Sequence, residues 1–204
     1  MATFKLRGNT VNTNGPLPEV GHNAPDFILT KTDMKDVTLA DFKGHTVILN
    51  VFPSVDTPVC SASVRRFNQE VTKLDGVKVL SVSLDLPFAH NRFCEAEGIK
   101  NVISTSELRN RDFGNSYGLR IAEGALKGLL ARAVIVLGES SKVVYAKLVE
   151  DLSNEPDYES IIGVVQDHLT KQASGLNVCT SASTPEHARI GNPDDPCDDG
   201  RAGA

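Results

Sequence analysis

Four cysteines are the most reactive side chains of this 204-residue chain, at positions 60, 94, 179 and 197. In a reducing compartment an isolated cysteine is either a small buried hydrophobic residue or a reactive group, and its surroundings decide which of the two it is. Cys60 closes the segment Thr57-Pro58-Val59-Cys60. The thiolate is the nucleophilic form of cysteine, and the Thr57 hydroxyl can hydrogen-bond both a thiolate and an incoming oxygen atom. This pair therefore suits chemistry on a peroxide.

The elements that must position Cys60 follow from the pattern of apolar residues. TVILNVF (46–52) is a continuous apolar run, typical of a central strand buried on both faces. Apolar residues then recur at positions 60, 64, 67, 71 and 74, which is helical spacing, and VKVLSVSL (77–84) is a second buried strand. Cys60 is thus predicted to begin a helix between two strands, where free N–H groups and the helix dipole stabilise an anion.

The remaining segments complete an α/β fold. FILT (27–30) and VTLADF (37–42) are predicted as strands or strand fragments, and PFAHNRFCEAE (87–97) as a short helix carrying Cys94. RAVIVL (132–137) and KVVYAKLV (142–149) form a predicted antiparallel hairpin, and residues 157–172 a last helix. This order is that of a thioredoxin-like fold, with a central mixed sheet flanked by helices.

The two ends of the chain differ from this central part. Residues 3–14 are predicted to form an N-terminal β-hairpin that turns at Gly8-Asn9. Residues 173–204 are rich in Gly, Ser, Thr, Pro and Asp and have little apolar surface to bury, so we predict a disordered tail. The domain is accordingly predicted to span residues 1–172.

Composition and charge exclude several classes of function. No run approaches the ~18 apolar residues of a membrane span, and the first thirty residues lack the apolar stretch of a secretory signal, so we expect a cytoplasmic protein. The formal net charge is -5, with no cluster of Lys and Arg among aromatic residues, so no nucleic-acid partner is expected. Histidines do not pair at ligand spacing and no Gly-rich nucleotide loop is present, so neither metal nor cofactor is predicted.

Several segments resemble a known family. Pro53-Ser54-Val55-Asp56-Thr57-Pro58-Val59-Cys60 resembles the P-x-x-x-T-x-x-C motif of peroxiredoxins. Across residues 3–170 the chain is similar to the bacterial thiol peroxidases, an atypical two-cysteine peroxiredoxin subfamily, and the segments that carry the similarity are NVFPSVDTPVCSASVRRFN, SLDLPFAHNRFCEAEGI, ALKGLLARAVIVL and EPDY.

This resemblance implies a role for each matching residue. Cys60 would attack hydrogen peroxide or an alkyl hydroperoxide and become a sulfenic acid, Thr57 and Arg132 would position the peroxide, and Pro53 would shield the thiolate. Cys94 would resolve the sulfenic acid as a disulfide within the chain, which requires both helix segments to unwind locally. The resemblance also implies thioredoxin as the reductant and a homodimer.

Two residues depart from the family pattern. Glu95 replaces a commonly small residue after the resolving cysteine, and its charge is expected to raise the pKa of Cys94 and slow resolution. Ala125 replaces a usual proline and is expected to loosen the loop that leads to Arg132. Cys179 and Cys197 lie outside the match and are interpreted as incidental thiols.

Other interpretations of these residues stay open at the level of sequence. Cys60 can be an inert core residue with Thr57 a helix cap, Arg132 a strand-end salt bridge, and Cys94 a buried structural thiol. The corresponding alternative functions are a non-enzymatic redox sensor, in which the disulfide switches a partner surface, and a one-cysteine peroxidase.

Overall fold

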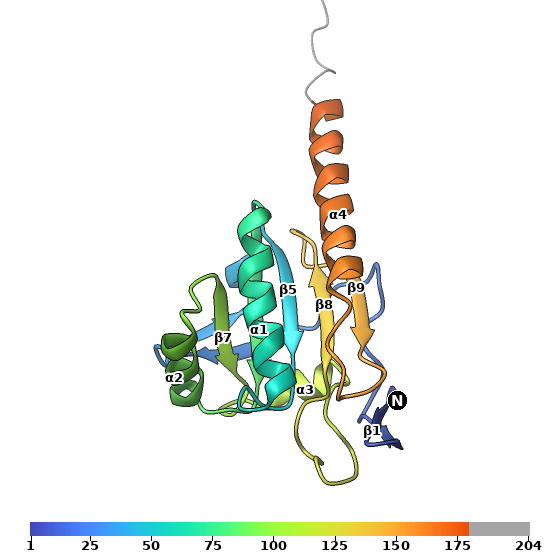
Figure 1. Cartoon of the computed structure of the whole chain (residues 1–204). Helices are drawn as coiled ribbons and strands as arrows, with labels where there is room; N and C mark the ends of the chain where they lie inside the picture. The colour runs from blue at the N-terminus through green and yellow to red at the C-terminus, as the bar shows by residue number, and fades with distance from the viewer. Residues whose placement is uncertain (180–204) are drawn as a thin grey trace, which may run out of the picture.

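A seven-stranded mixed sheet forms the centre of the protein (Figure 1), with the strand order β4-β3-β7-β6-β5-β8-β9. The computed structural model describes residues 1–179, and side chains to residue 174. The three central strands β5 (Thr46–Val51), β6 (Val77–Ser83) and β7 (Val102–Ser106) are parallel. The outer strands join antiparallel: β3 (Ile28–Lys31), β4 (Asp36–Thr38), β8 (Ala133–Leu137) and β9 (Val143–Leu148).

Helices cover the sheet because each buried strand is apolar on both faces. The described helices are α1 (Pro58–Glu70), α2 (Pro87–Glu97), α3 (Asp112–Ser116) and α4 (Tyr158–Cys179), with 3-10 turns at Leu39–Phe42 and Val71–Lys73. Successive residues of a strand point to opposite faces. Ile48 of β5 accordingly packs with Val64 of α1 and Ile161 of α4, whereas Leu49 packs with Phe113 of α3. The predicted sheet flanked by helices is confirmed.

The predicted N-terminal hairpin is present as β1 (Thr3–Leu6) and β2 (Asn9–Asn12). It turns at Arg7 and Gly8, whose φ angles are 51° and 82°, one residue before the predicted turn, because Leu6 pairs with Asn9 and Asn9 is already part of β2. Phe4 and Val11 are buried against Ile121, Ala131 and Leu152. The hairpin is therefore anchored on the segments that flank β8 and β9.

Three differences from the predicted elements have physical reasons. The strand β7 and the helix α3 were not predicted, because NVISTS has only two apolar residues and α3 is a single turn. VTLADF is not one strand: the Asp41 carboxylate accepts hydrogen bonds from the backbone N–H and the hydroxyl of Thr38, and the chain enters a 3-10 turn there. The last helix continues to Cys179, past its predicted end at Gln172. The rest of the predicted tail, residues 180–204 with Cys197, lies outside the described residues.

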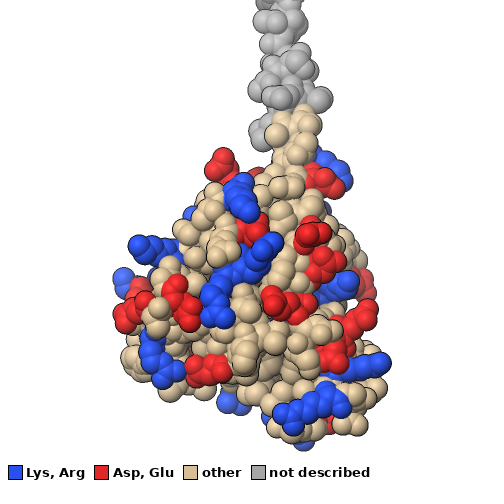
Figure 2. All heavy atoms as spheres, in the orientation of Figure 1, with Lys and Arg blue, Asp and Glu red and all other residues tan. Residues whose placement is uncertain are grey.

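The charged side chains of the face in Figure 2 are interspersed, with Lys and Arg next to Asp and Glu. On this face they form no basic stripe of the kind that tracks a nucleic-acid backbone. Within residues 1–179, no helix combines the length and the apolar character that crossing a bilayer requires.

Candidate active site

Cys60 lies in the first turn of α1, immediately after the buried strand β5 and the loop 53–57. Thr57 is the extended residue before the helix, and Pro58 occupies a first-turn position that needs no backbone N–H donor. The Cys60 side chain is fully buried, in an apolar cluster with Phe52, Val55 and Val64. Its sulfur thus sits at the positive end of a thirteen-residue helix and out of bulk water.

The Thr57 side chain points to this sulfur and does not cap the helix. Its Oγ1 lies 2.7 Å from Cys60 Sγ and 3.1 Å from the carbonyl oxygen of Ser54, and it makes no capping bond to α1. A hydroxyl has one proton, so it donates to one of the two at a time. The Thr57 hydroxyl is thus directed at the Cys60 sulfur, and no hydrogen bond supports the interpretation of its side chain as a helix cap.

Arg132 reaches the same sulfur from the start of β8. Because β8 runs antiparallel to β5 and Ala133 pairs with Val51, Arg132 lies beside the loop that follows β5. Arg132 Nη2 is 3.3 Å from Cys60 Sγ, and the side chain is only 2% exposed. Among residues 1–174 it forms no ion pair with a carboxylate, and its Nη1 has no hydrogen-bond partner. A strand-end salt bridge therefore does not account for Arg132.

The N-terminal hairpin helps to fix this guanidinium. Arg132 Nε and Nη2 donate to the carbonyl oxygen of Leu152 at 3.3 and 3.2 Å. The backbone N–H of Leu152 in turn donates to the carbonyl oxygen of Lys5 in β1, at 2.9 Å. The contribution of the hairpin to the site could not be read from the sequence, because this chain of contacts joins segments about 150 residues apart.

Pro53 and Cys94 complete the predicted set, but only Pro53 lies in the loop that carries Cys60. Pro53 is buried at the start of that loop. Cys94 is half-buried on α2, and its Sγ lies 3.3 Å from the Ser104 hydroxyl of β7. Both Cys60 and Cys94 are free thiols that pack in the same apolar cluster. The structure thus brings Thr57, Arg132 and Cys60 together in one site, whereas Cys94 is hydrogen-bonded to Ser104.

Burial is the main influence on the Cys94 thiol. Removal from water disfavours the thiolate and raises the pKa of Cys94, and the neighbouring Glu95 carboxylate raises it further. The hydrogen bond with Ser104 acts in the opposite direction. The expected influence of Glu95 is therefore present but smaller than that of burial.

A row of polar residues crosses the sheet beneath α1 and α2. Asn50, Ser81 and Ser104 are register partners on β5, β6 and β7, and the row ends at Cys94 through its contact with Ser104. At the other end, the Asn50 amide donates to the hydroxyl of Ser63, 3.2 Å away, on α1. Asn50 and Ser81 were not singled out from the sequence, although each interrupts an apolar run, and Ser104 lies in a strand that was not predicted.

A second set of polar residues was also missed. Asp85 follows β6 by two residues and accepts hydrogen bonds from Ser54 and Val55 of the loop that carries Thr57. The signal was available: β5 and β6 are parallel, so residues that follow them meet at one edge of the sheet. An acidic residue directly after the second strand is therefore expected to face the Cys60 loop.

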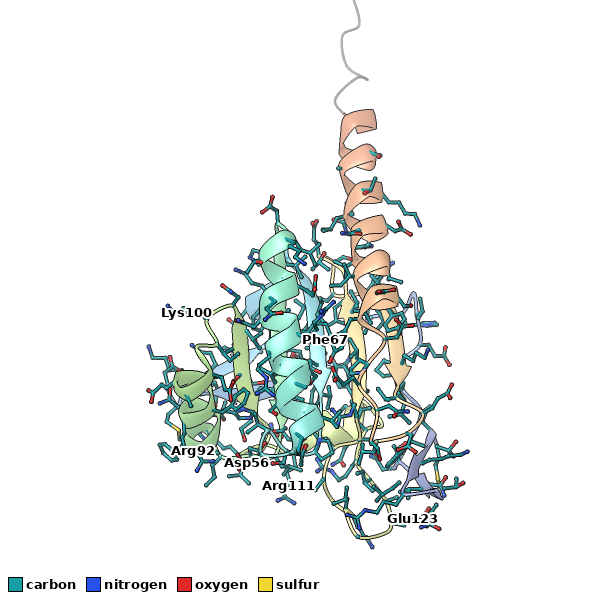
Figure 3. The ribbon with its side chains drawn as sticks, viewed as in Figure 1. Asp56, Phe67, Arg92, Lys100, Arg111 and Glu123 are labelled. Atoms are coloured by element: carbon teal, nitrogen blue, oxygen red, sulfur yellow. The ribbon has the colours of Figure 1, made fainter. Side chains whose placement is uncertain are left out.

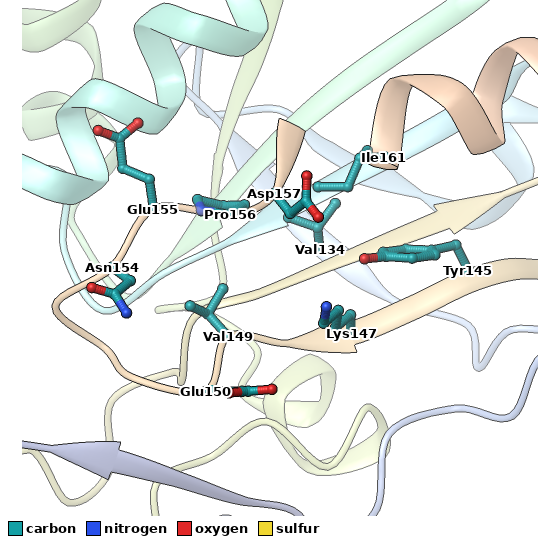
Figure 4. Close-up of a pocket in the computed structure, with 10 residues that line it drawn as sticks. All are labelled: Val134, Tyr145, Lys147, Val149, Glu150, Asn154, Glu155, Pro156, Asp157 and Ile161. Atoms are coloured by element: carbon teal, nitrogen blue, oxygen red, sulfur yellow. The ribbon is translucent and has the colours of Figure 1, made fainter. Parts of the chain in front are cut away.

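Several hollows in the described part of the chain lie outside the Cys60 site, among them one beside α2 and one beside β9. The first, of about 460 Å³, has Cys94 in its wall together with Glu95, Lys100 and Ser104. The second, of about 280 Å³, lies between β9 and the loop 149–157 and includes none of the five predicted residues (Figure 4). Across the described part of the chain, no group of three or more His, Cys, Asp or Glu side chains could hold a metal ion.

Comparisons with known proteins fit this arrangement. Residues 19–162 match the family model described as Redoxin. Over 165 residues the chain is 48% identical to the thiol peroxidases of Mycobacterium bovis and Mycobacterium tuberculosis, a match that covers 81% of this chain and 99% of each relative. The chain belongs to the redoxin family. The predicted resemblance to bacterial thiol peroxidases and the predicted peroxidase activity are thereby confirmed.

Solved structures of redoxins share its fold. A peroxiredoxin-like protein from Aquifex aeolicus is 40% identical, with a TM-score of 0.77 over 81% of this chain and 96% of that one. The thiol peroxidase from Chromobacterium violaceum, at 22% identity, has the same TM-score over 83% of this chain and 98% of its own. At that lower identity the likeness concerns the fold alone.

Proposed function

We propose that the chain reduces hydrogen peroxide and organic hydroperoxides by direct attack of Cys60. The Cys60 thiolate attacks the terminal peroxide oxygen, an S–O bond forms as the O–O bond breaks, and the departing oxygen takes a proton and leaves as water or an alcohol. Cys60 remains as a sulfenic acid, the first step of thiol oxidation. The observation that carries this proposal is the convergence of Thr57 Oγ1 and Arg132 Nη2 on one buried sulfur.

Thr57 and Arg132 supply the donors for this step. The guanidinium balances the charge of the thiolate, and its Nη1, which has no partner within residues 1–174, is free to bind the oxygen that becomes negative as the O–O bond breaks. Thr57 donates its proton to the same oxygen or to the thiolate. Pro53, at the start of the loop, helps to keep water from the sulfur.

We further propose that Cys94 resolves the sulfenic acid. The Cys94 thiolate attacks the Cys60 sulfur and displaces the hydroxyl group, which leaves as water after protonation, and a disulfide forms within the chain. Because Cys94 contacts Ser104 and not Cys60 in the resting structure, α2 and the start of α1 must unwind for this step. In the one-cysteine alternative, Cys94 stays on α2 and an external thiol attacks the sulfenic acid directly.

Thioredoxin is the proposed reductant. One of its thiols attacks the Cys60–Cys94 disulfide to give a mixed disulfide, and its second thiol displaces the chain, so two thiols are restored here and one disulfide forms on thioredoxin. A cytoplasmic location is proposed from the lack of long apolar stretches in the sequence, and a homodimer is proposed because the resemblance implies it.

The test is the oxidation of NADPH coupled through thioredoxin reductase and thioredoxin, with hydrogen peroxide and a bulky alkyl hydroperoxide compared. We expect sustained turnover by the wild-type chain and background turnover by Cys60→Ser, which removes the nucleophile with little change in volume. A chain that consumes a single equivalent of peroxide and then stops would contradict the enzyme and favour the redox sensor.

A further inference from the structure

The Asp85 carboxylate holds the loop that carries Thr57. Its Oδ2 accepts a hydrogen bond of 2.6 Å from the backbone N–H of Val55, and its Oδ1 accepts one of 2.8 Å from the Ser54 hydroxyl. Ser54 also accepts from the N–H of Asp56 and provides the carbonyl oxygen that contacts Thr57. One carboxylate thus fixes the backbone that aims the Thr57 hydroxyl at Cys60.

The same carboxylate is connected to α2. The Ser83 hydroxyl donates to Asp85 Oδ2 at 2.7 Å, so its oxygen acts as acceptor for the other two contacts, with the N–H of Asp85 and with Nε2 of His90 at 2.9 Å. This assigns the His90 proton to Nε2. His90 is fully buried, and its Nδ1 has no partner in the part of the chain that the structure describes.

His90 is one of only two buried residues of α2, and Cys94 follows it by four residues, or about one turn. The contact between His90 and Ser83 therefore holds the turn of α2 that precedes Cys94, and it breaks if α2 unwinds back to this turn as Cys94 moves toward Cys60. A second link joins the loop to α2 through Asp56 and Arg92, 3.1 Å apart and labelled in Figure 3. Both side chains are more than half exposed, so this ion pair contributes little.

We propose that Asp85 is a positioning residue with two opposed effects on the catalytic cycle. By holding Ser54 and Val55 it speeds the reaction of Cys60 with peroxide, and through Ser83 and His90 it holds α2 folded and slows disulfide formation. The inference rests on the proposed function, since it takes Cys60 as the attacking and Cys94 as the resolving residue.

The two effects can be separated by single-turnover kinetics. Samples are quenched with an alkylating agent after addition of hydrogen peroxide, and mass spectrometry follows the loss of the Cys60 thiol and the formation of the Cys60–Cys94 disulfide. Asp85→Ala is expected to slow the first step about 10-fold, because it removes a charged acceptor of several hydrogen bonds, and to speed the second several-fold. In excess peroxide it should also accumulate less Cys60 sulfinic acid than wild type.

Two further variants test which contacts of Asp85 cause each of the two effects. Asp85→Asn keeps one carbonyl oxygen for Val55 and Ser83, so it should recover most of the peroxide step. His90→Leu, of similar volume, should speed disulfide formation more than it changes the peroxide step, and it tests the link to α2 if Asp85→Ala does not fold. Asp41→Ala is the matched control, because the Asp41 carboxylate also accepts from a backbone N–H and a hydroxyl, but in a 3-10 turn that does not contact the Cys60 loop.

The outcomes distinguish this inference from the proposed function. Opposed changes in the two steps for Asp85→Ala, absent in Asp41→Ala, support the positioning role. Two steps that both match wild type, or that both slow in proportion to a lower melting temperature, overturn it. A wild-type chain that reacts at Cys60 but forms no disulfide with Cys94 would instead contradict the proposed resolution.

Discussion

The surroundings of Cys60 and Cys94 differ in burial, in position along the helix and in the presence of a positive charge. Cys60 is fully buried at the start of α1 and lies within hydrogen-bond distance of a hydroxyl and a guanidinium. Cys94 is half-buried in the last turn of α2, and the hydroxyl of Ser104 is its hydrogen-bond partner. A thiol that meets a small peroxide from solution benefits from fixed donors, whereas a thiol that must travel to its target benefits from weak attachment.

The two helices that carry these cysteines, α1 and α2, differ in how many side chains they bury. α1 buries Cys60, Ser61, Ser63, Val64 and Phe67, whereas α2 buries Pro87 and His90. Because burial of apolar side chains supplies most of the free energy that holds a helix in place, unwinding α2 costs less than unwinding α1. The larger part of the movement that joins the two sulfurs is therefore expected in α2, with α1 opening only near its first turn.

Removal of the Arg132 guanidinium is expected to have the largest effect on the contrast between Cys60 and Cys94. Arg132→Met keeps an unbranched side chain of moderate length but loses every donor, so we expect the rate constant for peroxide reduction to fall by about 10³-fold, the upper range for loss of a transition-state donor. Disulfide formation from a sulfenic acid already made should change much less. A loss below tenfold, measured by competition for hydrogen peroxide, would show that Arg132 supports the fold only.

Thr57→Val is also expected to slow the reaction of Cys60 with peroxide, but by a smaller factor than Arg132→Met. The change keeps the branched shape and deletes the hydroxyl that lies 2.7 Å from Cys60 Sγ. We expect the peroxide rate constant to fall by about 10²-fold without a matching loss of thermal stability, because Thr57 makes no capping bond to α1. An unchanged rate constant would remove Thr57 from the mechanism.

Glu95→Gln tests how a neighbouring charge affects the Cys94 thiol, and its expected effect is smaller than those of the two variants at the Cys60 site. Burial and the Glu95 carboxylate both raise the pKa of Cys94, so disulfide formation should accelerate as the pH rises and more thiolate forms. Removing the carboxylate lowers that pKa, so the pH profile of disulfide formation should move to lower pH, with a gain of about twofold at neutral pH, because the charge is exposed. A profile that stays in place would assign the raised pKa to burial alone.

Short-range patterns in the sequence predicted the elements that carry the site. The apolar run at 46–52, the helical spacing from Cys60 and the proline at the start of 87–97 each use neighbouring residues, and each corresponds to an observed element. The motif resemblance supplied Arg132, whose place beside Cys60 depends on the pairing of β5 with β8.

Contacts between distant segments explain what the sequence did not predict. Leu152 accepts from Arg132 and donates to the N-terminal hairpin, and Asp85 joins the Cys60 loop to α2 through Ser83 and His90. Neither set has a periodicity or a motif of its own. The parallel pairing of β5 and β6 could have pointed to Asp85, but nothing local marks His90 as its partner.

The comparison of Cys94→Ser with wild type tests the central claim most directly, because it separates attack by Cys60 from resolution by Cys94. After one equivalent of hydrogen peroxide, wild type should run as a monomer on a non-reducing denaturing gel, lose two free thiols and yield a cross-linked Cys60–Cys94 peptide pair. Cys94→Ser should react once at a near-normal rate, retain a Cys60 sulfenic acid that dimedone traps, and lose turnover with thioredoxin, while excess peroxide drives Cys60 to sulfinic and sulfonic acids. If Cys94→Ser turns over with thioredoxin as fast as wild type, and the oxidised wild-type chain contains no Cys60–Cys94 pair, the resolving role of Cys94 is contradicted.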